Sequence, residues 1–249
     1  MKPLDNESLM QFANREIEAF HEARLARLEN VKLTDVLKRK NPYLFRAKNI
    51  LTAGELIRAI LDAFLSSSEE ELFGRLFLES LAIYIATKTV DGRKSSAEGI
   101  DLEFDRDSIR YIVSIKSGPN WGNAQQIKRL ADNFKAAVRI QKQGRTSLHI
   151  QPVLGICYGK TRTTDNGLYL KIAGQSFWHF ISDDPNLYTD IIEPIGYRAK
   201  EHNETFLKQK AALENRFTSK FIQDFCDTTG TINWEKVVTF NSGNLRPED

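Results

Sequence analysis

Cysteine and histidine are scarce in this chain. Only two cysteines occur in 249 residues, Cys157 and Cys226, and no CxxC spacing or Cys/His cluster accompanies them. This argues against a disulfide framework and against a structural zinc site. The four histidines are scattered, without HxH or HxxxH spacing. A zinc-dependent hydrolase and an HNH-type site are therefore not expected.

Long apolar runs are also missing. No stretch reaches the roughly 18 residues that a membrane span requires, and the first residues, MKPLDNESLM, are polar and acidic, unlike a signal peptide. We therefore expect a cytoplasmic protein. With 41% hydrophobic residues over 249 positions, the chain can bury a substantial core. One domain, or one with a helical annex, is the expectation.

The net charge of +2 is small, but the basic residues are unevenly distributed. Between Arg24 and Lys48, eight Lys/Arg residues accompany two acids, and between Lys128 and Arg162 eight accompany the single Asp132. Two basic regions around an acidic middle suit a phosphate-binding protein with a metal site. The alternative for each region is a solvated helix face.

Hydrophobic spacing divides the chain into a helical first half and a mixed second half. Apolar residues at intervals of three and four predict helices over 8–28 and 51–86. Asn41-Pro42 interrupts the basic segment 38–49 between them, and Ser66–Ser68 followed by three glutamates predict a capped helix start. Short β-type runs follow, and a polar helix closes the pattern. The predicted later elements are strands at 99–104, 108–116, 147–159 and 167–172 and helices at about 123–141 and 203–227.

One group of polar residues in the second half has the spacing of a catalytic site. Asp101 stands at the head of one predicted strand, and after twelve further residues Ser114-Ile115-Lys116 lies on the next. Because strand side chains alternate, Ser114 and Lys116 share one face, and a hairpin adds Asp101 to it. A carboxylate can hold a hard cation while a lysine offsets charge and orients the attacking water. The pattern fits metal-assisted phosphodiester hydrolysis.

These residues resemble the PD-(D/E)XK nuclease superfamily and, within it, the type II restriction endonucleases. Asp101 matches the first motif acid and Lys116 the motif lysine, and Glu79 stands where the family often places an accessory metal-ligating glutamate. IKSGPNWGN is similar to the turn after the catalytic strand, and AGQSFWHFISDDPNLY to a C-terminal segment of some members. The resemblance covers roughly residues 72–195.

The resemblance implies an α/β fold with a restriction-endonuclease-like core, in which helices flank a central mixed sheet, and an N-terminal helical region. It further implies a single nuclease domain over 1–249, with a DNA-contacting or dimerising helical annex at 1–68, a catalytic core at 69–200 and a helical segment at 201–249. The expected catalytic residues are Asp101, Lys116, Glu79 and Ser114, with Mg²⁺ held by Asp101 and Glu79. The expected DNA-binding residues are Lys38, Arg39, Lys40, Arg46, Lys48, Asn120, Trp121, Asn123 and Lys128.

One position departs from the family pattern. Ser114 stands where the family usually has an acid, and losing a carboxylate weakens a magnesium site. Glu79 is the favoured replacement, because a helix packed on the sheet can direct it toward the same pocket. The other candidates are Glu98, Glu103, Asp132, Gln125 and Gln126. Without compensation, the fold would bind DNA without cutting it.

The leading hypothesis is a type II restriction endonuclease that cuts both strands of a specific duplex site. Helix before the sheet and a segment after it favour this hypothesis, since reading a sequence needs elements beyond the catalytic core. The alternatives are a structure-specific repair or recombination nuclease and an inactive DNA-binding protein. The partners expected are double-stranded DNA and a second copy of the chain, with a cognate DNA methyltransferase as a genetic partner.

Dimerisation follows from symmetry, because one chain supplies one Asp101/Lys116 site and a duplex has two antiparallel strands. The helices at 9–28 and 204–225 offer apolar surface for it. The favoured stripe is Phe206, Leu213, Phe217 and Phe221, and its alternative role is to pack on its own domain.

Three other motifs are weaker. GICYGKT at 155–161 has three residues where a phosphate loop needs four, and it reads as strand, so it is set aside. Phe177 and Trp178 have helix spacing and are predicted to be core. Trp121 has two open roles, packing under the sheet or contact with the sugar-phosphate edge of DNA. The run 41–45 has two compatible roles, to position the basic residues around it and to form a helix corner.

Overall fold

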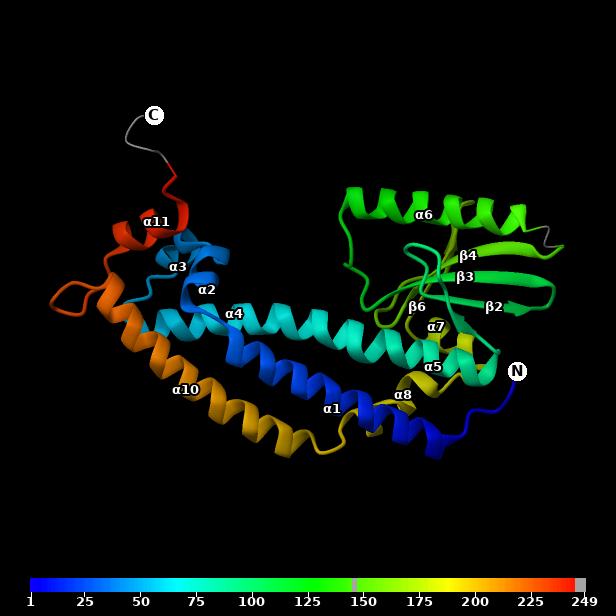
Figure 1. Cartoon of the computed structure of the whole chain (residues 1–249), viewed down its shortest axis with the longest axis horizontal. Coiled ribbons are helices and arrows are strands. Elements are labelled where there is room, and N and C mark those ends of the chain that lie inside the picture. The colour runs from blue at the N-terminus through cyan, green and yellow to red at the C-terminus, as the bar shows by residue number, and fades with distance from the viewer. Residues whose placement is uncertain (145–146, 245–249) are drawn as a thin grey trace. The chain divides into compact units, whose positions relative to one another are not determined.

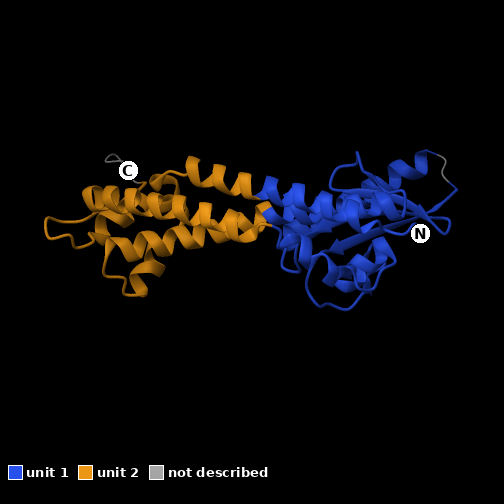
Figure 2. Ribbon diagram, turned by 90° about the horizontal axis from the view of Figure 1, so that it is seen from below, with its two compact units in different colours: residues 1–20, 73–197 blue, residues 21–72, 198–249 orange. Residues whose placement is uncertain are grey.

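The computed structural model describes residues 1–144 and 147–244, which form two compact units (Figures 1 and 2). Unit 1 comprises Met1–Phe20 and Phe73–Tyr197, and unit 2 comprises His21–Leu72 and the chain from Arg198 onward. The first 20 residues thus belong with the sheet-bearing unit, although the sequence placed them in the annex. Across the described ranges, no helix is both long and apolar enough to cross a membrane.

Unit 1 is built on a mixed sheet whose described strands follow the order β1-β2-β3-β4-β6-β5. The strands are β1 (Arg93–Lys94), β2 (Leu102–Arg106), β3 (Ile109–Lys116), β4 (His149–Ile156), β5 (Thr164–Asp165) and β6 (Leu170–Ala173). β3, β4 and β6 run parallel, whereas β1 pairs antiparallel with β2, β2 with β3, and β5 with β6. The predicted α/β class with a central mixed sheet is confirmed.

Helices cover both faces of this sheet (Figure 1). Side chains of β3 alternate between them: Ile112 packs with Phe134 of α6 (Ala124–Gln143), whereas Val113 belongs to the cluster of α5 (Ser80–Thr89) and α7 (Gln175–Ser182). Phe177 and Trp178 of α7 lie in the second cluster, 0% and 2% exposed, which confirms that they are core. Burial on both faces explains why β3 and β4 read as nearly continuous apolar runs.

The remaining elements of unit 1 are short or shared with unit 2. α8 (Leu187–Asp190) and α9 (Ile192–Ile195) follow α7, and α1 (Asn6–Asn30) contributes Leu9, Ala13 and Ile17 to the α5-side cluster. α4 (Ala53–Phe73) leads into a π-helix, η1 (Gly74–Glu79), and then α5.

The predicted helix start at Ser66–Ser68 is wrong, since α4 runs through it. Ser67 Oγ donates to the carbonyl of Ala63 at 3.0 Å, and Ser68 is 8% exposed. A serine hydroxyl that bonds one turn back can stay inside a helix, and here it caps nothing.

Unit 2 is helical. Its core joins α4 to α2 (Leu33–Arg39), α3 (Pro42–Ala47), α10 (Ala199–Phe225) and α11 (Trp234–Ser242). The stripe expected at a dimer interface lies in this core: Phe206, Leu213, Phe217 and Phe221 are 4%, 3%, 5% and 0% exposed. The amphipathic pattern was real, but the surface that it packs against belongs to the same unit.

Candidate active site

The β2–β3 hairpin brings Asp101 and Ser114 together. Leu102 pairs with Val113, so Asp101, one residue before β2, lies opposite Ser114, and its main-chain amide donates to the Val113 carbonyl at 2.8 Å. Opposite residues in an antiparallel pair share a face, and Lys116 follows two positions after Ser114 on the same side. Three of the expected site residues therefore gather where β3 ends.

The Asp101 carboxylate occupies the place that β2 leaves open. β2 begins at Leu102, so it no longer flanks β3 at Ile115. There Oδ2 of Asp101 accepts a hydrogen bond from the Ile115 main-chain amide at 2.6 Å and a longer one from Ser114 Oγ at 3.4 Å. Ser114 is fully buried. The strand itself thus fixes the position of this carboxylate.

Glu79 reaches the site from a different element. It is the last residue of the π-helix η1, a helix type that is rare and frequent at functional sites because it shifts the helical register. Gly74, the first residue of η1, lies against the end of β3: a Cβ there would stand 2.8 Å from Cβ of Ser117. A side chain at position 74 would therefore push η1, and Glu79 with it, away from the strand.

The charges of the site act on one another. Burial is the main cause that raises the pKa of Glu79, and the nearby Asp101 raises it further, against the opposing effects of Lys94, Lys116 and Arg75. Burial likewise raises the pKa of Asp101, opposed by the Ile115 amide and then by the Lys116 ammonium. Both carboxylates therefore hold their protons more tightly than ordinary acids, because burial disfavours the charged form.

Cys157, just beyond β4, marks the floor of the site. Burial raises the pKa of its thiol, and Glu79 and Asp101 add to the effect. Its carbonyl accepts from the Trp178 indole at 2.8 Å. A buried thiol that keeps its proton is a poor nucleophile and a poor metal ligand.

A cleft of about 320 Å³ opens on the α6 side of this site. Ser114, Lys116 and Trp121 line it, together with Gln126, Arg129 and Asn133. Trp121 is half-buried against the α6-side cluster, and the Lys116 ammonium lies over its ring, 5.6 Å from the centroid. Packing under the sheet is thus one role of Trp121, and holding Lys116 in the cleft is a second.

A family model decides the identity of the chain. The model of the type II restriction endonuclease EcoO109I matches residues 7–203. The chain belongs to this family. A search of the curated proteins found no match. The resemblance to PD-(D/E)XK nucleases is confirmed, and with it a function in sequence-specific cleavage of DNA.

Ser114 stands where this family usually has an acid, and the structure places the candidate replacements differently. Glu79 is the candidate whose pKa is raised by the charge of Asp101. The other acids pair with different partners: Glu98 with Arg129 at 2.7 Å, Glu103 with Arg93 at 3.1 Å, and Asp132 with Lys135 at 3.8 Å. Gln126 forms the capping box of α6 with Asn123, and Gln125 is exposed on the same helix.

The donor set at the site fits a hard divalent cation. In the described part of the chain, no group of three or more His, Cys, Asp or Glu side chains is arranged to hold a metal. Two carboxylates with otherwise free coordination positions are what Mg²⁺ accepts, because this ion keeps several waters and is often bound through one or two carboxylates. Soft or nitrogen donors are not offered, since Cys157 is buried and protonated.

The residues expected to bind DNA fall in both units. Asn120, Asn123 and Lys128 are exposed near the cleft in unit 1. In unit 2, Lys38, Arg39, Arg46 and Lys48 are exposed around α2 and α3, and Lys40 donates to the Ala63 carbonyl at 2.8 Å. Asn41 caps α3 and Phe45 is buried, so the run 41–45 forms a helix corner. Arg145, of the second basic region, lies outside the described residues.

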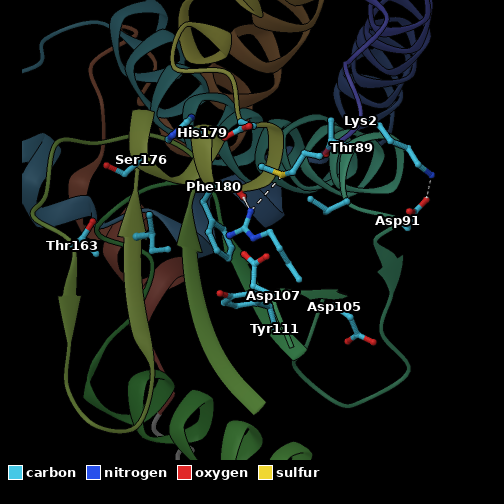
Figure 3. A pocket seen from close by; sticks show the side chains of 15 residues that line it. Lys2, Thr89, Asp91, Asp105, Asp107, Tyr111, Thr163, Ser176, His179 and Phe180 are labelled. Carbon is cyan, nitrogen blue, oxygen red and sulfur yellow. Dashed lines mark hydrogen bonds and ion pairs between the residues drawn. The ribbon is translucent and has the colours of Figure 1, made fainter. Parts of the chain in front are cut away.

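A cavity of about 850 Å³ lies at the other end of β2 and β3 (Figure 3). Asp105, Asp107 and Tyr111 line it near the hairpin turn, whereas Asp101 and Lys116 occupy the opposite strand ends. Arg106 fills part of it, bonded to the Phe180 carbonyl at 2.8 Å. This cavity is therefore separate from the candidate site.

Lys94 and Arg75 belong to this neighbourhood but were not expected from the sequence. Lys94, on the two-residue strand β1, acts on the charges of both Glu79 and Asp101. A strand of two residues has no detectable periodicity, so no sequence signal placed Lys94 here.

Proposed function

We propose that this restriction endonuclease is Mg²⁺-dependent and that Asp101 and Glu79 hold the ion. The supporting observation is that Asp101 and Lys116 gather at the end of β3 and that the charge of Asp101 adds to the cost of ionising the buried Glu79. A bound divalent cation would remove that cost, and it would activate water and neutralise charge on the phosphate.

The residues of the chain then have separate tasks. Lys116, held over Trp121 in the cleft, offsets the negative charge that builds on the phosphate oxygens as water attacks and the leaving oxygen departs. Asp101 is fixed by the Ile115 amide, and buried Ser114 supports it from the same strand. Ser114 in this account positions the carboxylate and does not replace the missing acid.

We divide the expected DNA contacts between two sets of residues, one that positions the duplex through its phosphates and one beside the cleft. We assign phosphate contacts to the exposed basic residues Lys38, Arg39, Arg46 and Lys48 of unit 2, with Lys40 in support. Asn120, Trp121, Asn123 and Lys128 border the catalytic strand and are assigned to DNA near the cut. Phosphate contacts fix the register of a protein on DNA without reading its sequence.

We further propose a two-fold homodimer that cuts both strands of a symmetric site. One chain offers one Asp101/Lys116 site, so a dyad matches two sites to two antiparallel strands. The α10 stripe is not its interface, because that stripe is buried within unit 2. We further infer a cognate DNA methyltransferase as a genetic partner and, for an enzyme that acts on DNA, a cytoplasmic location.

Plasmid DNA of mixed sequence, incubated with the purified protein and Mg²⁺, tests the proposal. We expect discrete fragments with Mg²⁺ and none with EDTA. Asp101→Asn should give none in Mg²⁺ while binding the same duplex in Ca²⁺. A smear, fragments in EDTA or an active Asp101→Asn variant would refute it. Linear product without a nicked intermediate would support the dimer.

A further inference from the structure

Lys94 is placed beside the site by the edge strand β1. Lys94 pairs with Leu102, so Ser95 lies opposite Asp101, and the Ser95 main-chain amide donates to the Asp101 carbonyl at 3.3 Å. β1 runs antiparallel to β2 and therefore toward the strand end that carries Asp101. Lys94 is thus next to the register position of the first motif acid.

Buried Glu103 fixes which way Lys94 faces. Glu103, 6% exposed, accepts from Arg93 at 3.1 Å and from Ser95 Oγ at 2.5 Å. Residues 93 and 95 are held on the side of Glu103, and side chains alternate along a strand. Lys94 therefore faces the opposite side, which is the side of α5 and of Glu79.

β1 is also held tightly against α5. A Cβ at Gly92 would stand 2.9 Å from a methyl group of Leu102 and 3.1 Å from Cβ of Ala86. The main-chain amide of Gly92 donates to the Ala86 carbonyl at 2.9 Å. The position of Lys94 is therefore set by the packed core and not by a loose loop.

The Lys94 ammonium is available to a ligand. Lys94 is exposed, and among the described residues it has no hydrogen bond or ion pair, in contrast to its neighbour Arg93. A lysine that remains unpaired beside two carboxylates leaves its charge free for an anion. The anion that a DNA endonuclease brings to this place is a phosphodiester.

We propose that Lys94 is a second catalytic lysine, whose ammonium contacts the phosphate of the cleaved strand together with Lys116. This inference rests on the proposed function of the site. The two acids would then face two lysines, one on each side of the end of β3. The second lysine supplies positive charge as the phosphate gains negative charge, which is where fixed charges accelerate a reaction most.

The test compares Lys94→Gln with Lys94→Arg and with the control Lys88→Gln, which removes an exposed lysine at the end of α5. In single-turnover cleavage with saturating Mg²⁺, we expect Lys94→Gln to be slower by about 10- to 100-fold. Lys94→Arg should recover most of the rate, because it keeps the charge. Lys88→Gln should stay within about twofold of the parent protein, as a charge remote from the site should.

Two further measurements separate contact with the substrate from an indirect role. Lys94 also favours ionised Glu79 and Asp101; if that were its whole role, the Lys94→Gln rate would recover at high pH. We expect the loss to persist at every pH. Without DNA, calorimetry with Ca²⁺ should show binding that is tighter in Lys94→Gln by a few-fold, since a repelling charge is gone.

The experiments distinguish failure of the proposed role of Lys94 from failure of the proposed function of the whole site. An Asp101→Asn variant that cleaves would refute the site as a whole. An enzyme that Asp101→Asn inactivates but Lys94→Gln leaves unchanged would refute only the role of Lys94. Recovery of the rate at high pH, or weaker Ca²⁺ binding in Lys94→Gln, would refute it as well, because Lys94 would then act through the carboxylates or the fold.

Discussion

The main-chain amide of Ile115 donates a 2.6 Å hydrogen bond to Oδ2 of Asp101. The residue between Ser114 and Lys116 thus binds the first motif acid through its backbone, and its side chain packs in the α5-side core. Motif acid and motif lysine are held by one strand, so their separation is fixed by strand geometry.

Asp101→Asn should stabilise the metal-free protein. Burial raises the pKa of Asp101, so its charged form costs stability at neutral pH, and the cost disappears as pH falls through the folded-state pKa. Asparagine removes the charge and keeps an acceptor for Ile115. We expect the free energy of unfolding in EDTA to rise by roughly 0.5–2 kcal/mol, measured by urea titration.

The matched control is Asp132→Asn on α6, where the acid is exposed and paired with Lys135 at 3.8 Å. It should change stability little. A destabilised Asp101→Asn protein would mean that ionised Asp101 supports the fold, contrary to the direction of its pKa.

As pH is lowered, the cleavage rate should begin to fall at a higher pH than it would if Glu79 and Asp101 had ordinary carboxylate pKa values. The pKa values of Glu79 and Asp101 are both raised, and a metal needs both acids ionised. Single-turnover rates between about pH 5 and 9 should show an acid limb that moves to lower pH as Mg²⁺ is increased. If the acid limb stayed at the same pH at every Mg²⁺ concentration, the group that titrates would not be a ligand of the metal, contrary to this prediction.

Ser114→Ala should have only a moderate effect. Ser114 is fully buried, and its bond to Asp101 is long at 3.4 Å, whereas the Ile115 amide remains in the variant. We expect the single-turnover rate to fall by about 2- to 10-fold, because only one long hydrogen bond to the carboxylate is lost. Inactivation as complete as that of Asp101→Asn would instead make Ser114 part of the chemistry.

Arg39→Glu should weaken binding to specific and random duplex about equally. Arg39 is exposed at the end of α2, and losing one phosphate contact should lower the slope of log affinity against log salt by roughly 0.9. Lys236→Glu on exposed α11 surface is the control, with an unchanged slope. Lys40 suits this test less well, since it also bonds to the Ala63 carbonyl.

The parts of the site that could be predicted are those that depend on residues close together in the sequence. Alternation over 108–116 gave the face shared by Ser114 and Lys116, and the hairpin register added Asp101. Helical spacing placed Glu79 on a helix before the sheet, although its π-helical register depends on the close approach of Gly74 to Ser117. No local pattern encodes such an approach.

The errors share a physical cause. The Phe206–Phe221 stripe identified an apolar helix face, but periodicity does not say which surface covers it, and it is the core of unit 2. β1 pairs with β2, and the Arg93 and Ser95 side chains bond to Glu103 on that neighbouring strand. Lys94 was missed because a two-residue strand has no detectable periodicity, and Glu103, a candidate ligand by sequence, instead binds Arg93 and Ser95.

In our proposal, Glu79 supplies the acid that position 114 lacks. The single-turnover rate at which Glu79→Gln cleaves a cognate duplex in saturating Mg²⁺ tests this role. We expect a loss of about 100- to 1,000-fold or more, with Ca²⁺-supported DNA binding retained, as for Asp101→Asn and Lys116→Ala. A Glu79→Gln enzyme that cleaves at the parent rate would contradict it.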